Sequence, residues 1–147
     1  MTDTSPDASP SPPIETVRPA ALHADVPYAY ATVVPAGSLV LAAGACPIDE
    51  HGVVVEPGDV PAQARRAMTN LTTVLTEAGC SLADVVRTTV FVASPDQADL
   101  VAAWEVVRAA FGDWDPPSTL LGVAVLGWTG QLVEVEATAV RRTAPAP

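Results

Sequence analysis

The residues best suited to acid and base chemistry are two glutamates in the segment VEVEATAV, Glu134 and Glu136. Residues two apart in a β-strand project from the same face, so both carboxylates share a face with Leu132, Thr138 and Val140. One interpretation is a solvated strand face. The other is an apolar cleft, in which burial disfavours the charged form of a carboxylate and suits it to proton transfer.

Two further residue types that often carry chemistry stand alone in the sequence. Cys46 could be a nucleophile, but no histidine lies near it, and a lone cysteine is more often a small buried apolar residue, so we expect it to be inert. His23 and His51 lack the spacing of metal ligands. The sequence therefore predicts no metal site, and nothing in it requires a cofactor.

The charge of the chain argues against several classes of function. Its 147 residues contain 17 acidic residues and seven basic ones, all arginine, for a net charge of -10. The electrostatic field of this negative charge repels phosphate groups, so nucleic acid and anionic membranes are poor partners. Without lysine, the chain cannot form a Schiff base through a lysine amine. The first residues do not resemble a signal peptide and no apolar run reaches about 18 residues, so we expect a cytoplasmic protein with free thiols.

Composition along the chain indicates one folded domain. Residues 1–21 are rich in proline, serine and aspartate, and we expect a disordered arm there. Residues 143–147 have the composition of a flexible tail, which leaves a domain over 22–142. At the start of that domain, two β-prone runs, 28–34 and 38–45, flank a turn signal at 35–37 and predict a hairpin.

Apolar spacing predicts two helices. The first begins at Val60, with Asp59 as its cap and Gly79 as its stop. After a buried strand from Asp84, the segment SPDQ predicts a second helix capped by Ser94. Its expected buried face is Leu100, Trp104, Val107 and Phe111. Two strands over 119–127 and 131–140 follow, so the order ββαβαββ predicts an α+β fold in which a mixed sheet carries both helices on one face.

Five segments have the order and spacing of a known family: PYAYATVV, AAGACPID, QARRAMTNLTTVLTEAG, DVVRTTVFVAS and VEVEATAVRR. Together they resemble the RidA/YjgF family of enamine/imine deaminases, over about residues 26–142. The resemblance implies a chorismate-mutase-like α+β fold. It also implies a homotrimer with small-molecule clefts between the subunits.

The resemblance further implies roles for particular residues. Tyr28, which follows Pro27, matches a tyrosine of the family's cleft. Gly44 matches a glycine whose backbone lines the cleft, and Glu134 matches a glutamate that positions water. We therefore favour the acid/base interpretation for Glu134 and the solvated strand face for Glu136.

The family's carboxylate-binding arginine is replaced in this chain. In the segment PPST, Ser118 stands in its place, and one hydroxyl cannot supply the charge or the planar fork that grips a carboxylate. Hydroxyls after a Pro-Pro pair often satisfy backbone groups of a turn, but Ser118 and Thr119 could instead contact a ligand. Arg87, on a neighbouring predicted strand, is another guanidinium, although nothing in the sequence directs it to the cleft.

Other departures make the predicted cleft more apolar. Trp104 takes the place of a polar residue, Ala43 that of a serine, and Tyr30 that of a glutamine. Flat or apolar ligands are therefore better candidates than small 2-imino acids. The predicted substrate-binding residues are Gly44, Ser118, Thr119, Tyr30, Trp104 and Leu120, and the predicted catalytic residues are Glu134 and Tyr28.

Three functions fit these residues, and we rank them in this order. The first is an enzyme in which Glu134 transfers a proton or orients water on an imine, enamine or carbonyl intermediate, in a hydrolysis, tautomerisation, cyclisation or condensation. The second is a non-catalytic protein that binds a metabolite or a partner. The third is the family's deamination of 2-imino acids, surviving without the arginine.

Overall fold

The main sheet of the protein is mixed, as the sequence predicts. The computed structural model describes residues 13–17, 19, 29, 31–34 and 37–142. The strands lie in the order β3-β6-β4-β5. β3 (Ser38–Leu41) and β4 (Val85–Val92) both run antiparallel to β6 (Val133–Arg141), whereas β5 (Ser118–Gly122) runs parallel to β4.

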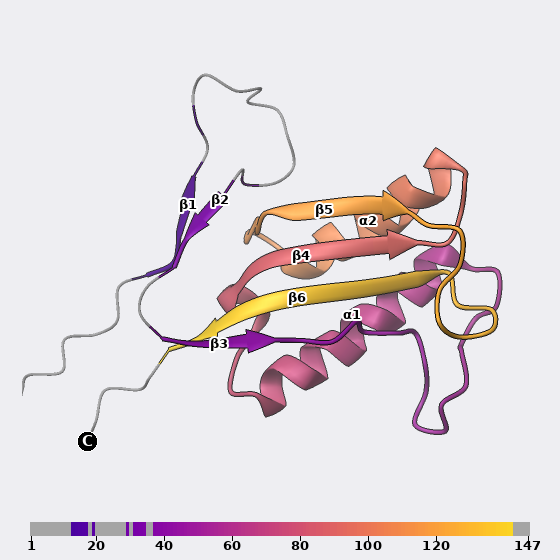
Figure 1. Cartoon of the computed structure of the whole chain (residues 1–147), viewed down its shortest axis with the longest axis horizontal. Helices are drawn as coiled ribbons and strands as arrows, with labels where there is room; N and C mark the ends of the chain where they lie inside the picture. Colours follow the sequence, from indigo (N-terminus) through magenta and orange to yellow (C-terminus); the bar gives the residue numbers. More distant parts are fainter. Residues whose placement is uncertain (1–12, 18, 20–28, 30, 35–36, 143–147) are drawn as a thin grey trace, which may run out of the picture.

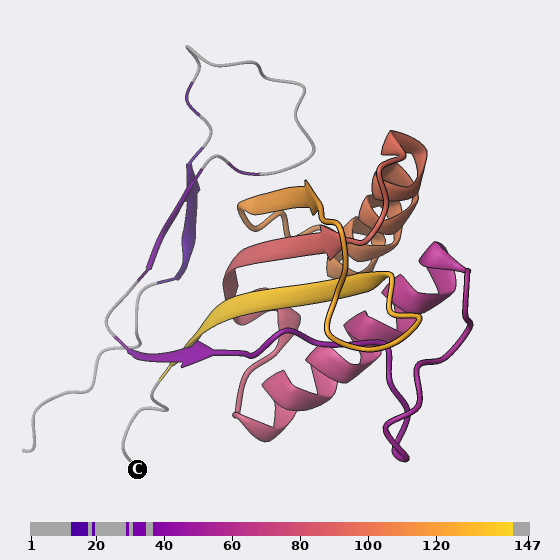
Figure 2. The ribbon, with the colours of Figure 1, turned by 45° about the vertical axis from the view of Figure 1, so that its right-hand side comes forward.

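Both long helices cover one face of this sheet (Figures 1 and 2), which confirms the predicted α+β fold. α1 (Val60–Glu77) packs on β6, α2 (Gln97–Phe111) packs on β4 and β5, and the helices contact each other. We call the other side of the sheet the open face. No helix within the described residues is long and apolar enough to span a membrane.

Alternation along β6 sets which side chains reach each face. Val133, Val135, Ala137 and Ala139 are buried in the core under the helices. The residues between them are Glu134, Glu136 and Thr138, which therefore project from the open face. This confirms the predicted division of the strand and leaves the glutamates outside the core.

The helix ends agree with the sequence in one case and differ in the other. Asp59 caps α1 by accepting a 2.8 Å hydrogen bond from a first-turn N–H, and Gly79, with φ of +76°, follows the helix. α2 is capped by Asp96 instead of Ser94. The Ser94 hydroxyl instead donates to Asp99 at 2.7 Å, which leaves the cap to the nearer carboxylate.

The predicted N-terminal hairpin is wrong. β2 (Ala31–Val33) pairs with β1 (Glu15–Val17), while β3 pairs with the edge of β6, because tertiary contacts and not nearness in sequence choose a strand's partner. β1 also adds a strand inside segment 1–21, where we expected a disordered arm.

A short 3-10 turn, η1 (Leu82–Asp84), leads into β4. The domain limits 22–142 stay a prediction.

One buried amide ties α1 to the segment that precedes β6. Gln63 is 0% exposed. Its Nε2 donates to the carbonyls of Glu56 and Gly130 at 3.2 and 3.0 Å, and its Oε1 accepts from the N–H of Leu132 at 2.8 Å. Because these backbone groups are removed from water, they depend on Gln63 for their partners.

We therefore expect Gln63→Leu to lower the free energy of unfolding by about 2–3 kcal/mol, since it leaves buried donors and acceptors without partners. Gln97→Leu, at the exposed start of α2, is the matched control and should change stability by less than about 0.5 kcal/mol. Urea unfolding followed by circular dichroism measures both. Equal losses in the two variants would contradict this role for Gln63.

Candidate functional site

Glu134 lies near the start of β6, half-buried on the open face. In the ladder with β4 it stands opposite Phe91, and Phe91 stands opposite Leu121 of β5. Side chains directly opposite each other on one face of a sheet are in contact range. The carboxylate therefore has an apolar row beside it across the sheet.

Gly44 brings a second segment against this carboxylate. A bridge between Ala45 and Val135, with hydrogen bonds of 2.8 and 3.2 Å, holds that segment on β6. A Cβ atom added to Gly44 would overlap the carboxyl group of Glu134 and lie 2.7 Å from its Cγ. Glu134 thus occupies the space that a larger residue at 44 would fill. These two predicted site residues are adjacent in the structure.

Gln131 orients the carboxylate. Its side-chain amide donates to Glu134 Oε2 at 2.9 Å and to the carbonyl of Val133 at 3.2 Å. Its Oε1 accepts from the N–H of Trp128 at 3.1 Å. Gln131 is 3% exposed, so its polar atoms must keep these partners. The buried amide therefore fixes one oxygen of Glu134.

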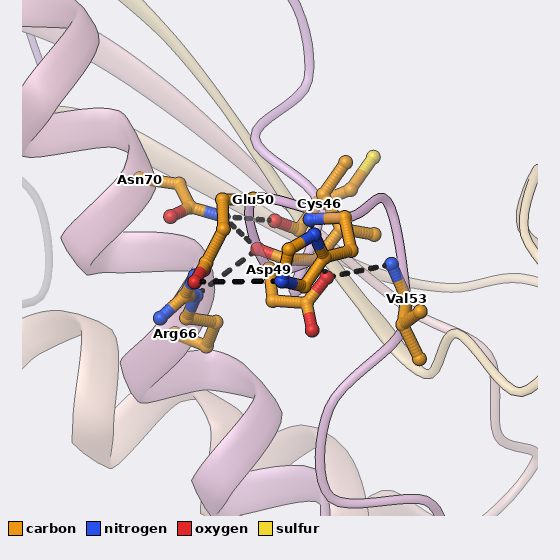
Figure 3. Close-up of polar contacts among 8 residues, drawn as sticks. Cys46, Asp49, Glu50, Val53, Arg66 and Asn70 are labelled. Carbon is orange, nitrogen blue, oxygen red and sulfur yellow. Dashed lines mark hydrogen bonds and ion pairs between the residues drawn. The ribbon is translucent and has the colours of Figure 1, made fainter.

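Cys46 contacts the same oxygen, with its Sγ 3.3 Å from Glu134 Oε2. Its position depends on α1, because Asn70 donates to the Cys46 carbonyl at 2.8 Å and to the Ile48 carbonyl at 2.9 Å. Arg66 donates to the Ile48 carbonyl as well, at 3.0 Å. Figure 3 shows this loop tied to the helix, with the sulfur on the side of Cys46 away from Asn70.

The environment keeps Cys46 in its thiol form. Burial raises the pKa of Cys46, and the hydrogen bond to Glu134 and its negative charge raise it further. The protonated thiol can then donate to Glu134 Oε2, and it is a poor nucleophile, as expected from the sequence. Among the described residues, Glu134 Oε1 accepts no hydrogen bond. That oxygen lies on the side of the carboxyl group that faces Gly44.

The other predicted site residues divide between the two faces. Ser118 lies on the helix-covered face, where the Thr88 hydroxyl is 2.7 Å from its own. Trp104 lines the same small cavity as Ser118, and Leu120 packs against the core. Thr119, by alternation, faces the open side and is exposed. Tyr28 and Tyr30 lie outside the described residues.

Sequence reasoning missed three neighbours of Glu134. Gln131 is three residues before it, and Cys46 is two residues after Gly44, which is the spacing of a shared strand face. Phe91 could be found only from the register of β4 against β6. Within the part of the chain that the structure describes, no group of three His, Cys, Asp or Glu side chains could hold a metal ion.

The contact between Gly44 and Glu134 gives a prediction for stability. Gly44→Ala should lower the free energy of unfolding by about 1–3 kcal/mol, because the new methyl displaces the carboxyl group. In a Glu134→Ala background the same change should cost little, since the overlapping atoms are gone. Gly127→Ala, where a Cβ atom meets nothing within 4 Å, is the control. Equal costs of Gly44→Ala in both backgrounds would rule out the contact.

The thiol gives a second prediction, tested in a Cys80→Ala background. Alkylation of Cys46 by iodoacetamide should rise with pH only above the range of an ordinary thiol. Glu134→Gln should move this midpoint down, because it removes the negative charge. Glu136→Gln, on the same strand, should leave the midpoint in place. An ordinary midpoint in all three proteins would show that Cys46 does not sense the carboxylate.

Comparison with known proteins identifies the family. The family model described as endoribonuclease L-PSP matches residues 18–141. The 2-iminobutanoate/2-iminopropanoate deaminase of Salmonella typhimurium is 36% identical over 115 residues, covering 77% of this chain and 88% of that protein. Protein DfrA of Myxococcus xanthus is 35% identical over 126 residues, covering 82% and 94%. The crystal structure of the Rid protein YyfB from Yersinia pestis matches with a TM-score of 0.81 at 30% identity, covering 86% and 98%. With the same fold and this similarity along most of its length, the chain belongs to the RidA/YjgF family.

Proposed function

We propose that the protein is a small-molecule enzyme in which Glu134 performs general acid/base chemistry on an imine, enamine or carbonyl-type intermediate. The observation that carries the proposal is the hydrogen bonding of this carboxylate. Its Oε2 is held by Gln131 and Cys46, while its Oε1 accepts no hydrogen bond from the described residues. A positioned carboxylate whose second oxygen takes no hydrogen bond from these residues can accept a proton from water and return it.

For an imine, the proposed reaction is hydrolysis. Glu134 takes a proton from water as the water oxygen forms a bond to the imine carbon. The carboxylic acid gives that proton to the nitrogen, which completes a neutral carbinolamine. The carboxylate then takes the proton of the new hydroxyl group and passes it to the nitrogen as the C=O bond forms and the C–N bond breaks, which yields a carbonyl compound and ammonia or an amine. The same proton transfer, applied to an enamine, moves a proton between carbon and nitrogen and gives a tautomerisation.

The preferred substrate has no requirement for a carboxylate. Ser118, at the family's arginine position, lies beside Thr88 on the helix-covered face and carries no charge. The row beside Glu134 is apolar, formed by Phe91 and Leu121. Both features favour a flat or apolar group next to the reacting carbon.

The proposed cleft lies between subunits of a homotrimer. The open face carries Leu39 and Leu41, which are 60% and 74% exposed, beside the polar row of β6. An exposed apolar patch on a small domain is commonly covered by another subunit. Contact between open faces would enclose Glu134 and shield it from bulk water.

Deamination of 2-imino acids is the second candidate, and the name of the Salmonella typhimurium relative supports it. A non-catalytic binding protein is the third. The description of the family model names an endoribonuclease, but the net charge of -10 repels RNA, so we place ribonuclease activity below all three.

The test is a hydrolysis assay on two imine sets, 2-imino acids generated in place and aryl or alkyl imines without a carboxylate. We expect the wild type to prefer the second set, and Glu134→Ala to lose about 100-fold or more in rate on it. Glu136→Gln, on the same face of β6, is the control for surface charge and should keep most of the rate.

The other outcomes assign the function differently. A wild type that prefers 2-imino acids, with a further gain in Ser118→Arg, would favour the deaminase. Full activity in Glu134→Ala would remove the proposed mechanism. A bound compound that is never turned over would leave the binding protein.

A further inference from the structure

The loop between β5 and β6 carries a tryptophan, Trp128, that is held by the same residue that orients Glu134. Gln131 donates its backbone N–H to the carbonyl of Trp128 at 3.0 Å, and its Oε1 accepts from the N–H of Trp128 at 3.1 Å. Gly130, with φ of +81°, lies inside this closed turn, in a conformation that strains other residues. Because the Gln131 side chain also donates to Glu134 at 2.9 Å, the turn fixes Trp128 relative to the carboxylate.

The indole of Trp128 lies beside the thiol that contacts Glu134. Burial raises the pKa of Cys46 and Glu134 raises it further, whereas hydrogen bonding by the side chains of Gln131 and Trp128 lowers it. A side chain lowers the pKa of a thiol in this way when its N–H lies close to the sulfur. Since the sulfur is 3.3 Å from Glu134 Oε2, the indole is one of the side chains that surround this carboxylate.

Trp128 differs in its packing from the other two tryptophans of the chain. Trp104 and Trp114 pack against the hydrophobic core, and Trp114 Nε1 donates to the carbonyl of Val85 at 2.8 Å. Among the described residues, the apolar side chains that pack against this core do not include Trp128. A core role therefore explains the first two indoles and does not explain the third.

Aromatic rings approach Glu134 from both sides of β6. Phe91 of β4 stands opposite Glu134 in the ladder. Cys46 belongs to the segment bridged to the other side of β6, and the indole of Trp128 lies beside it. Contacts within one chain set these positions, so both rings enter a cleft between subunits together with the carboxylate. Aromatic rings favour other flat rings as neighbours, in offset-stacked or edge-to-face arrangements.

We propose that Trp128 determines the substrate class of the acid/base site, which takes an imine or enamine that carries an aromatic ring. The ring of the substrate packs on the indole, on the Phe91 side, and places the reacting carbon at Glu134. This inference rests on the proposed function and names the group that the preferred substrate carries. Its physical basis is the contact between two π-systems, which a saturated ring of the same size does not make.

The kinetic test compares the N-methyl imines of acetophenone and cyclohexyl methyl ketone, which carry a flat and a saturated six-membered ring. Trp128→Leu should lower kcat/KM about tenfold for the acetophenone imine and less than about twofold for the other, because only the flat ring stacks. Trp128→Phe should keep most of the preference. Val101→Ala, which shortens an exposed apolar side chain on α2, should leave it unchanged. Equal losses on both imines in Trp128→Leu would overturn the proposal.

Binding of the two ketones tests the same claim without turnover. By calorimetry, acetophenone should bind the wild type about fivefold more tightly than cyclohexyl methyl ketone, and Trp128→Leu should remove the difference. Glu134→Gln should stop hydrolysis of both imines and keep this difference, so failure of the proposed chemistry and failure of this inference are distinguished. Equal affinities in the wild type would refute the assignment.

Sedimentation of Trp128→Leu separates a substrate contact from a contact between subunits. We expect this variant to keep the subunit number of the wild type while it loses the preference for the flat ring. A variant that loses subunits and keeps the ketone preference would assign the indole to subunit packing and overturn the proposal.

Discussion

The site depends on the contact between the carboxyl group of Glu134 and the bare Cα of Gly44. This contact is possible because the segment after β3 continues along β6 through the Ala45–Val135 bridge, and because residue 44 has no Cβ atom. A side chain at 44 would occupy the space of the Glu134 carboxyl group, so the glutamate would have to move. The direction of the carboxylate is therefore fixed by backbone pairing before any ligand arrives.

A set of amide side chains then holds the surrounding loops in register. Gln63 joins α1 to the segment before β6, and Gln131 in that segment reaches Glu134. Asn70, about two turns further along the same side of α1, donates to the carbonyl of Cys46, whose thiol reaches the same oxygen. The helix on one face of the sheet thus controls a carboxylate on the other face. Preorganisation of this kind lets a charged group act without rearranging during the reaction.

The sequence was sufficient for the parts of the fold that periodicity controls. The helix after Asp59, the buried strand before Ser94 and the alternation along β6 follow from spacing and caps, which act over a few residues. The partners of β2 and β3 did not follow, because strand pairing is decided by distant segments. The position of Gly44 beside Glu134 came from family resemblance. Gln131 and Cys46 were not predicted to contact Glu134. The register of three segments brings them to the carboxylate.

The same limit explains Ser118 and Arg87. The sequence showed that a guanidinium was absent at 118, but only the pairing of β4 with β5 shows that the hydroxyl there lies on the helix-covered face. Likewise, nothing in the sequence shows which way Arg87 points, whereas the ladder with β6 puts it on the open face. A shift of one residue in strand pairing moves each side chain to the opposite face of the sheet. The face on which a side chain lies therefore cannot be predicted from residue type alone.

The measurement that tests the central claim most directly is the steady-state kinetics of Glu134→Gln, which keeps the size of the side chain and removes its ability to accept a proton. On the best imine or enamine substrate, kcat should fall by about 100-fold or more while KM changes little, because the group acts in the transition state and not in ground-state binding. An unchanged kcat, or a loss confined to KM, would contradict the account and leave Glu134 as a binding or structural residue.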